Sequence, residues 1–171
     1  MQYKNFRKQL FYGMIGVGVL GSLFHFVYDF TGQNRFVGLF VAVNESTWEH
    51  MKLMFFPMLL LTGILVPKWR ETYANVELIL NLGNLAATWL IPVLFYTYRG
   101  ILGFGVSPAD IATFYVSELL AFWLILHLIK YRGNPLLKRL TAVSYLLIAI
   151  QGIAFMWFTY HPPALGIFAV P

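Results

Sequence analysis

The chain has 171 residues, of which 59% are hydrophobic and only 11% charged, with a formal net charge of +5. This composition lies well outside the range of soluble domains and indicates an integral membrane protein. The absence of cysteine excludes disulfides, thiolate catalysis, iron–sulfur clusters and cysteine-bound zinc, so any metal must be held by histidine or carboxylate. The positive charge is explained by loop topology, and nothing in the sequence indicates nucleic-acid binding.

Five apolar stretches are long enough to cross a bilayer, since a helical span needs about 20 residues. We place them at residues 10–30, 48–67, 75–96, 109–130 and 140–160. With short connections they use nearly the whole chain. The predicted fold is therefore an all-α polytopic membrane protein with five transmembrane helices in a single domain, residues 1–171.

Residues 36–43, between the first two spans, are apolar but too short to cross a membrane. We predict a short re-entrant or interfacial element there, packed against protein because free backbone groups cannot face lipid. This element is expected to control access to the outer mouth of the bundle.

The distribution of Lys and Arg predicts the orientation. Most of the 12 basic residues fall on one side of the predicted bundle: Lys4, Arg7, Lys8, Lys68, Arg70, Lys130, Arg132, Lys138 and Arg139. The other side has Arg35 and Arg99, with Lys52 just inside the second span. The positive-inside rule then places the N-terminus in the cytoplasm and the C-terminus outside, in the cell membrane.

Ionisable residues gather at the predicted outer ends of the spans. His25 and Asp29 are four residues apart on one helical face, where a carboxylate can orient an imidazole or share a metal with it. At the start of the second span, Ser46 with Glu49 fits a capping box, in which each side chain accepts a hydrogen bond from the other's backbone N–H. That motif does not account for Glu45.

His50 and His161 also fall at this level of the membrane. Three neutral imidazoles with a water in the fourth position make a catalytic zinc site. The histidines able to meet at the outer end are His25, His50 and His161, because His127 lies at the opposite end of its span. The candidate catalytic carboxylates are Asp29, Glu45 and Glu49. A polar network bridged by water, without metal, is the alternative.

A second set of polar residues lies deeper. Glu77, Asn81 and Asn84 share one face of the third span, and Glu118 and Gln151 lie near the middle of theirs. A lone carboxylate at that depth should be protonated or hydrogen-bonded. Glu118 could therefore carry protons, or it could tie helices together through Asn84 or Gln151.

The stretch from His25 through Lys52, with its Asn-Glu-Ser-x-Trp-Glu-His signature, and the ending Phe-Thr-Tyr-His-Pro-Pro resemble a group of small uncharacterised prokaryotic membrane proteins. The resemblance implies a membrane location and favours the outer cluster as the working site. In type of site the chain is distantly similar to alkaline ceramidases, which hold zinc through three histidines with an Asp and a Ser. It is also similar to sterol isomerases of the emopamil-binding kind, which use an intramembrane His and carboxylates. Both groups differ from it in the number of spans.

The predicted function is metal-dependent hydrolysis, with zinc as the expected ion and a membrane lipid or lipid-like small molecule as the substrate. One alternative is a proton-coupled carrier or channel lined by the deeper polar residues. Another is a non-enzymatic membrane subunit that binds a partner protein.

Overall fold

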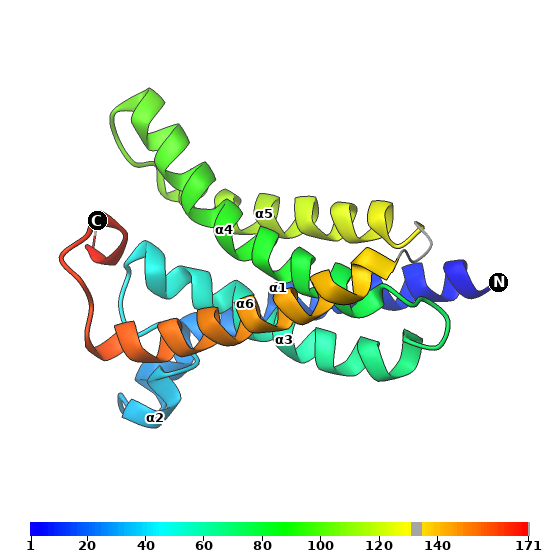
Figure 1. Cartoon of the computed structure of the whole chain (residues 1–171). Helices are drawn as coiled ribbons and strands as arrows, with labels where there is room; N and C mark the ends of the chain where they lie inside the picture. The colour runs from blue at the N-terminus through cyan, green and yellow to red at the C-terminus, as the bar shows by residue number, and fades with distance from the viewer. Residues whose placement is uncertain (131–134, 171) are drawn as a thin grey trace.

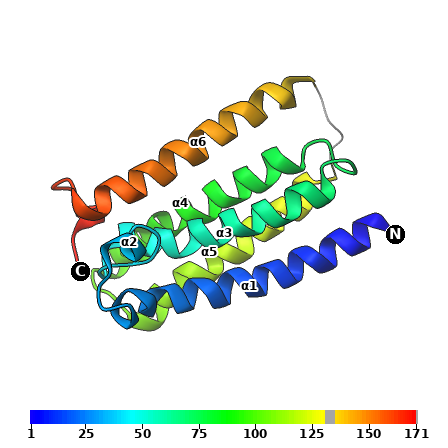
Figure 2. The same cartoon turned by 90° about the horizontal axis from the view of Figure 1, so that it is seen from below.

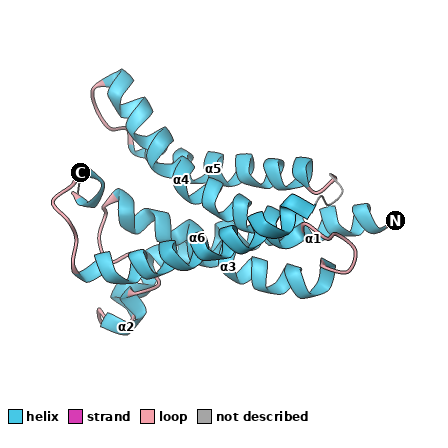
Figure 3. Cartoon of the chain, viewed as in Figure 1, coloured by secondary structure: helices cyan, strands magenta, loops and turns pink. Residues whose placement is uncertain are grey.

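The computed structural model describes residues 1–130 and 135–170. In this part of the chain the long elements are all helices (Figures 1 and 3). The elements are α1 (Gln2–Phe30), α2 (Arg35–Gly38), α3 (Thr47–Trp69), α4 (Val76–Leu102), α5 (Ser107–Leu128), α6 (Pro135–Tyr160) and a 3₁₀ turn, η1 (Gly166–Phe168). Of the predicted basic loop, Arg132 and the side chain of Lys138 lie outside the described part.

Five of these helices are long and apolar enough to cross a membrane: α1, α3, α4, α5 and residues Arg139–Tyr160 of α6. The prediction of an all-α, multi-pass membrane protein with five spans is confirmed. Several helices extend past the predicted apolar runs, because helical hydrogen bonding continues until the backbone is capped. α4, for example, runs on to Leu102 and ends at Gly103, whose φ of 78° is the left-handed conformation that favours glycine at helix ends.

Successive spans run in alternating directions, so the two termini lie at opposite ends of the bundle (Figure 1). The end at which α1, α4 and α6 finish and α3 and α5 begin is called the C-terminal end below. α3 and α4 pack against each other; α3 also contacts α1 and α6, and α4 also contacts α5 and α6. α1 and α6 lie on opposite sides of this centre (Figure 2).

The core follows from this arrangement. Because α3 has neighbours on most sides, Met51, Met54 and Phe55 are fully buried on it, whereas α1 leaves Phe11 and Val19 exposed. In a membrane, exposed apolar side chains of this kind face the hydrocarbon chains of the lipid. The polar residues that lie between the helices are therefore the ones that need explanation.

A glycine permits the close approach of α1 to its neighbours. A Cβ atom added at Gly21 would lie 2.6 Å from the carbonyl oxygen of Leu53 and 2.6 Å from the ring of Phe114. Small residues of this kind allow membrane helices to pack backbone to backbone. Gly21 thereby brings the C-terminal half of α1 close to both α3 and α5.

The predicted element at 36–43 consists of the last turn of α2 followed by turns, and it is tied to two helices. Lys52 Nζ of α3 donates to the Gly38 carbonyl at 2.7 Å, and the Tyr160 hydroxyl of α6 donates to the Arg35 carbonyl at 2.7 Å. These bonds fix the segment against the α3 and α6 side of the bundle.

Candidate metal centre

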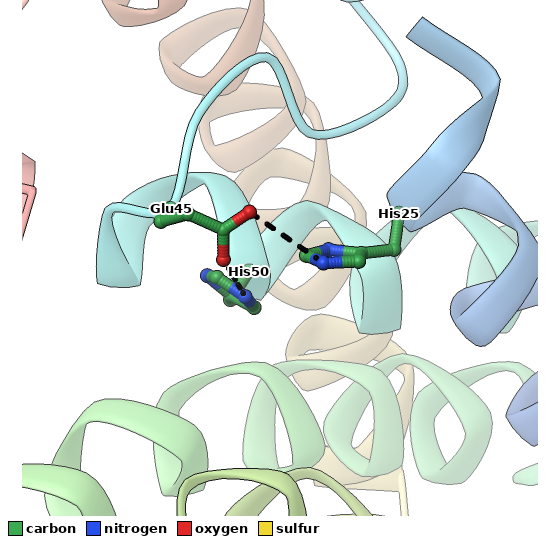
Figure 4. Close-up of side chains that lie close together, drawn as sticks. All are labelled: His25, Glu45 and His50. Atoms are coloured by element: carbon green, nitrogen blue, oxygen red, sulfur yellow. Dashed lines mark ion pairs between the residues drawn. The ribbon is translucent and has the colours of Figure 1, made fainter. Parts of the chain in front are cut away.

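Two imidazoles and one carboxylate meet at the C-terminal end of the bundle (Figure 4). His25 comes from α1, His50 from the first turn of α3, and Glu45 from the loop before α3. Nε2 of His25 lies 3.5 Å from Glu45 Oε1, and Nε2 of His50 lies 3.5 Å from Glu45 Oε2. The two rings are tilted to each other with centroids 5.3 Å apart. Each imidazole thus faces one oxygen of the same carboxylate.

The start of α3 explains how Glu45 reaches this position. Asn44 Oδ1 accepts the N–H of Ser46 at 2.9 Å, and Ser46 Oγ accepts the N–H of Glu49 at 3.4 Å. The chain therefore turns sharply before the helix and places Glu45 beside its first turn. The predicted capping box forms only in half, since the Ser46 N–H is taken by Asn44 and the Glu49 carboxylate bonds elsewhere.

The separations in this group suit metal ligands. A charged N–H···O bond is about 2.7–2.9 Å long, so 3.5 Å is too long for a good one. Two ligands each about 2.1 Å from a tetrahedral zinc lie about 3.4 Å from each other. One ligand atom from each of His25, Glu45 and His50 can be chosen so that all three lie within 4.8 Å of one another.

The tautomer of His50 also favours a role as a metal ligand. Its Nδ1 lies 2.9 Å from the Ser46 carbonyl, which can only accept, so Nδ1 must carry the proton. The lone pair of the neutral ring is then on Nε2, which faces the Glu45 carboxylate. Two electron-rich groups repel each other unless a proton or a metal ion lies between them. A backbone carbonyl that orients a ligand histidine in this way is the usual partner of a metal-binding imidazole.

Nδ1 of His25 is buried and has no hydrogen-bond partner in the described part of the chain. Among the described residues, no group therefore fixes which nitrogen of this ring carries the proton, and its Nε2, which faces Glu45, can act as a ligand.

The structure does not bring His161 to this group. The residue follows α6, is exposed, and stacks on Trp157 with ring centroids 4.5 Å apart, while its Nδ1 lies 3.2 Å from the Trp157 carbonyl. Its ring is thus held by the turn of helix that precedes it. Asp29, one turn beyond His25, is exposed and does not line the cavity described below. Glu45 takes the third place that the sequence assigned to His161.

Glu49 is also separated from the imidazoles, although it precedes His50 in the chain. One residue along a helix turns the side chain by about 100°, and Glu49 points towards α6. Its Oε2 pairs with Lys52 Nζ at 2.6 Å, and its Oε1 accepts from Thr159 Oγ1 at 3.0 Å. Being only 2% exposed, it cannot reach a substrate as a general base. Lys52 is a key residue that the sequence reasoning missed, although its i,i+3 spacing from Glu49 could have identified the pair.

A cavity of about 510 Å³ lies in front of the metal-ligand group, between α1, α3, α4 and α5. One wall carries an ion pair, Arg99 Nη2 to Asp110 Oδ2 at 2.9 Å. Another carries Ser22 and Tyr115, whose hydroxyl oxygens are 2.9 Å apart. Residues 36–43 are not among its lining residues, and the expected control of access by that element stays a prediction. From the sequence, Arg99 was considered only as a loop charge. Because a short connection leads from it to Asp110, the sequence could have indicated that the two residues form an ion pair.

The deeper polar residues bond across helix interfaces. The bonds run from Asn81 Nδ2 to Ser144 Oγ at 3.1 Å, from Asn84 Nδ2 to the Phe55 carbonyl at 3.2 Å, and from Trp89 Nε1 to Gln151 Oε1 at 3.1 Å. Glu77 lies beside Tyr145 of α6. These contacts tie α4 to α3 and α6, which is how polar side chains hold membrane helices together.

Glu118 differs from its predicted setting. Its carboxyl lies against α1, where a Cβ added at Gly18 would be 3.1 Å from Oε2. The predicted bond to Asn84 or Gln151 is absent among the described residues: Asn84 Nδ2 donates to the Phe55 carbonyl, and Gln151 Nε2 is buried without a hydrogen-bond partner there. Oε1 of Glu118 is buried without a hydrogen-bond partner in the same part of the chain.

Neither a curated protein nor a solved structure matches the chain. A family model does match it, over residues 1–170. The expected relation to an uncharacterised group is supported at this level, and the five apolar helices fit it, while the signature and the similarity to ceramidases stay predictions. Because the match covers nearly the whole length, the chain belongs to the Family of unknown function (DUF6512).

Proposed function

We propose that the protein is a metal-dependent hydrolase, with its ion held by His25, Glu45 and His50, and that its substrate is a lipid-like molecule lodged in the surrounding membrane. The observation that carries the proposal is the pair of equal 3.5 Å separations between one carboxylate and two imidazole Nε2 atoms. Each separation is too long for a good hydrogen bond and close to the distance between two ligands of one tetrahedral ion, which Glu45 would bind through one of its two oxygens.

Zinc is the ion that this donor set suits best. Two imidazoles and one carboxylate form the protein part of well-known catalytic zinc sites, which keep a fourth position open for water. The ion would lower the pKa of that water to about 7, which supplies hydroxide at neutral pH. The cavity in front of the three ligands provides room for the water and for a reacting group.

The remaining chemistry falls to the residues of the cavity. In the proposed reaction the oxygen of water bonds to a carbonyl carbon or a phosphorus atom, and the bond to the leaving oxygen or nitrogen breaks. Glu45 has two oxygens, so one can bind the ion while the other accepts the proton of water and passes it to the leaving group. The Tyr115 hydroxyl and the Arg99 guanidinium line the same cavity and can stabilise the negative charge that develops.

The carrier alternative is not supported by a comparable observation. A continuous proton path needs polar groups that are free to exchange partners, whereas Asn81 Nδ2 and Asn84 Nδ2 are bonded between helices. In the described part of the chain, Glu118 Oε1 and Gln151 Nε2 are the deep polar atoms that are buried without a partner. The proposed orientation, with the metal centre at the outer face of the cell membrane, rests on the positive-inside rule.

Metal content tests the proposal. Protein purified without chelator and equilibrated with zinc should contain close to one zinc ion per chain by elemental analysis. His50→Ala and Glu45→Ala should each lose it, because removing one of three ligands strongly weakens binding. His161→Ala is the matched control and should keep its zinc. Wild-type protein without zinc, or equal loss in His161→Ala and His50→Ala, would contradict the proposal.

A further inference from the structure

α1 and α5 line one side of the cavity, and the exposure of their lining side chains indicates a lateral opening between them. On the side of the cavity away from the C-terminal end of the bundle, Gly18 lies against Glu118, and the Ser22 and Tyr115 hydroxyl oxygens are 2.9 Å apart. Beyond that bond, towards the C-terminal end, the lining continues with Phe26 and Ile111, which are 55% and 62% exposed. The Ser22–Tyr115 bond thus forms the floor of an opening whose rims are apolar and face the surrounding lipid.

The inner wall holds one fixed guanidinium. Arg99 pairs with Asp110 through Nη2 and Nε, at 2.9 and 3.3 Å, and its Cζ lies 4.1 Å from the centre of the Phe95 ring. These contacts orient the group before any ligand binds. Nη1 has no hydrogen-bond partner in the described part of the chain, so donors remain for a ligand in the cavity that Arg99 lines.

Charge in the cavity favours an anion. The charged residues that line it are Glu45, Arg99 and Asp110. With a divalent ion in place, the positive charges of the ion and Arg99 exceed the two carboxylate charges by one. Inside a membrane protein such a charge acts more strongly than it does in water. A planar guanidinium also suits carboxylate and phosphate oxygens geometrically.

We infer that the site takes amphiphiles with one apolar chain and an anionic head group, either phosphate or carboxylate. This inference rests on the proposed function for the ion. The head group binds between the ion and Arg99, and the chain leaves between Phe26 and Ile111 into the lipid. A cavity of about 510 Å³ holds a head group with the start of a chain, so the rest of the chain stays in the bilayer.

The test uses radiolabelled dodecyl phosphate, dodecanoate and dodecanol, whose chains are equal in length. Retention of each is measured on zinc-loaded protein in lipid nanodiscs, with empty nanodiscs as background. At least one anionic probe should be retained at least about tenfold more than dodecanol, as expected for a charge-assisted contact. Whichever anionic probe is retained more identifies the head group.

Two variants separate the roles of head and chain. Arg99→Gln should lower retention of the anionic probes towards that of dodecanol. Ile111→Trp fills the side opening and should lower retention of all three probes; because this residue is exposed, the change should not disturb folding. Ile153→Trp, at an exposed position of α6 far from the cavity lining, is the matched control and should change nothing.

Equal retention of anionic probes and dodecanol would overturn the inference, as would an Ile111→Trp effect no larger than that of Ile153→Trp. Zinc is measured in the same samples, which keeps the two proposals apart. Zinc present without anion preference overturns the substrate class alone. If no zinc is found, the proposed function is contradicted. The effect of Arg99→Gln on probe retention then still decides the ligand class, because binding of a probe does not require turnover.

Discussion

Lys52 should be among the residues most important for stability, because it neutralises a carboxylate enclosed in the protein. Its side chain is 0% exposed and pairs with Glu49 Oε2 at 2.6 Å. It also donates to the Gly38 carbonyl at 2.7 Å and to Thr159 Oγ1 at 2.8 Å. Lys52→Met removes all three contacts and leaves the buried charge of Glu49 without a counter-ion. Breaking a buried pair in this way costs about 3–5 kcal/mol of unfolding free energy.

The expected value can be measured by titrating SDS into protein in mixed micelles and following tryptophan fluorescence. Lys68→Met, an exposed change on the same helix, is the control and should stay within about 0.5 kcal/mol of wild type. Adding Glu49→Gln to Lys52→Met should restore part of the loss, because the unpaired charge is then gone. A Lys52→Met loss within about 1 kcal/mol of the Lys68→Met value, the range of exposed ion pairs, would refute the reasoning.

Three further predictions concern packing, orientation and metal release. Gly21→Ala should destabilise by about 1–3 kcal/mol in the same titration, because its Cβ would lie 2.6 Å from the Leu53 carbonyl oxygen. Gly16→Ala, whose Cβ would meet nothing within 4 Å, should not, and equal effects would contradict the packing. Reporter fusions after positions 70 and 135 should lie in the cytoplasm and those after 105 and 171 outside; a cytoplasmic C-terminus would reverse the proposed orientation. The affinity for zinc should fall as pH falls from about 7 to 5, since protons compete for the imidazoles, and an affinity that does not change over this range would contradict histidine ligands.

The five spans could be predicted from the sequence because an uninterrupted apolar run of about 20 residues has few other uses. The ends of the helices could not, since helical bonding continues beyond the apolar run, as it does in α4 as far as Gly103. Alternating spans also placed His25 and His50 at the same end of the bundle. That inference needs only the order of the spans and no knowledge of packing.

The choice among residues at that end depends on tertiary contacts. His161 is predicted to lie at the same membrane depth as His25 and His50, but its ring stacks on Trp157. Glu49, in the first turn of α3, was a candidate carboxylate beside Glu45, yet the helix turns Glu49 towards Lys52 and away from His50. Such differences follow from the rotation of each helix about its own axis, which hydropathy does not determine.

X-ray absorption at the zinc edge of the zinc-loaded protein tests the central claim most directly, because it reports the atoms bound to the ion. The structure predicts two imidazole nitrogens and one carboxylate oxygen, with a water, at about 2.0–2.2 Å. The spectrum should be unchanged in His161→Ala and should lose one imidazole in His25→Ala. A shell of three imidazoles that loses one in His161→Ala, or a shell of oxygen atoms alone, would contradict the assignment of His25, Glu45 and His50 as the metal ligands.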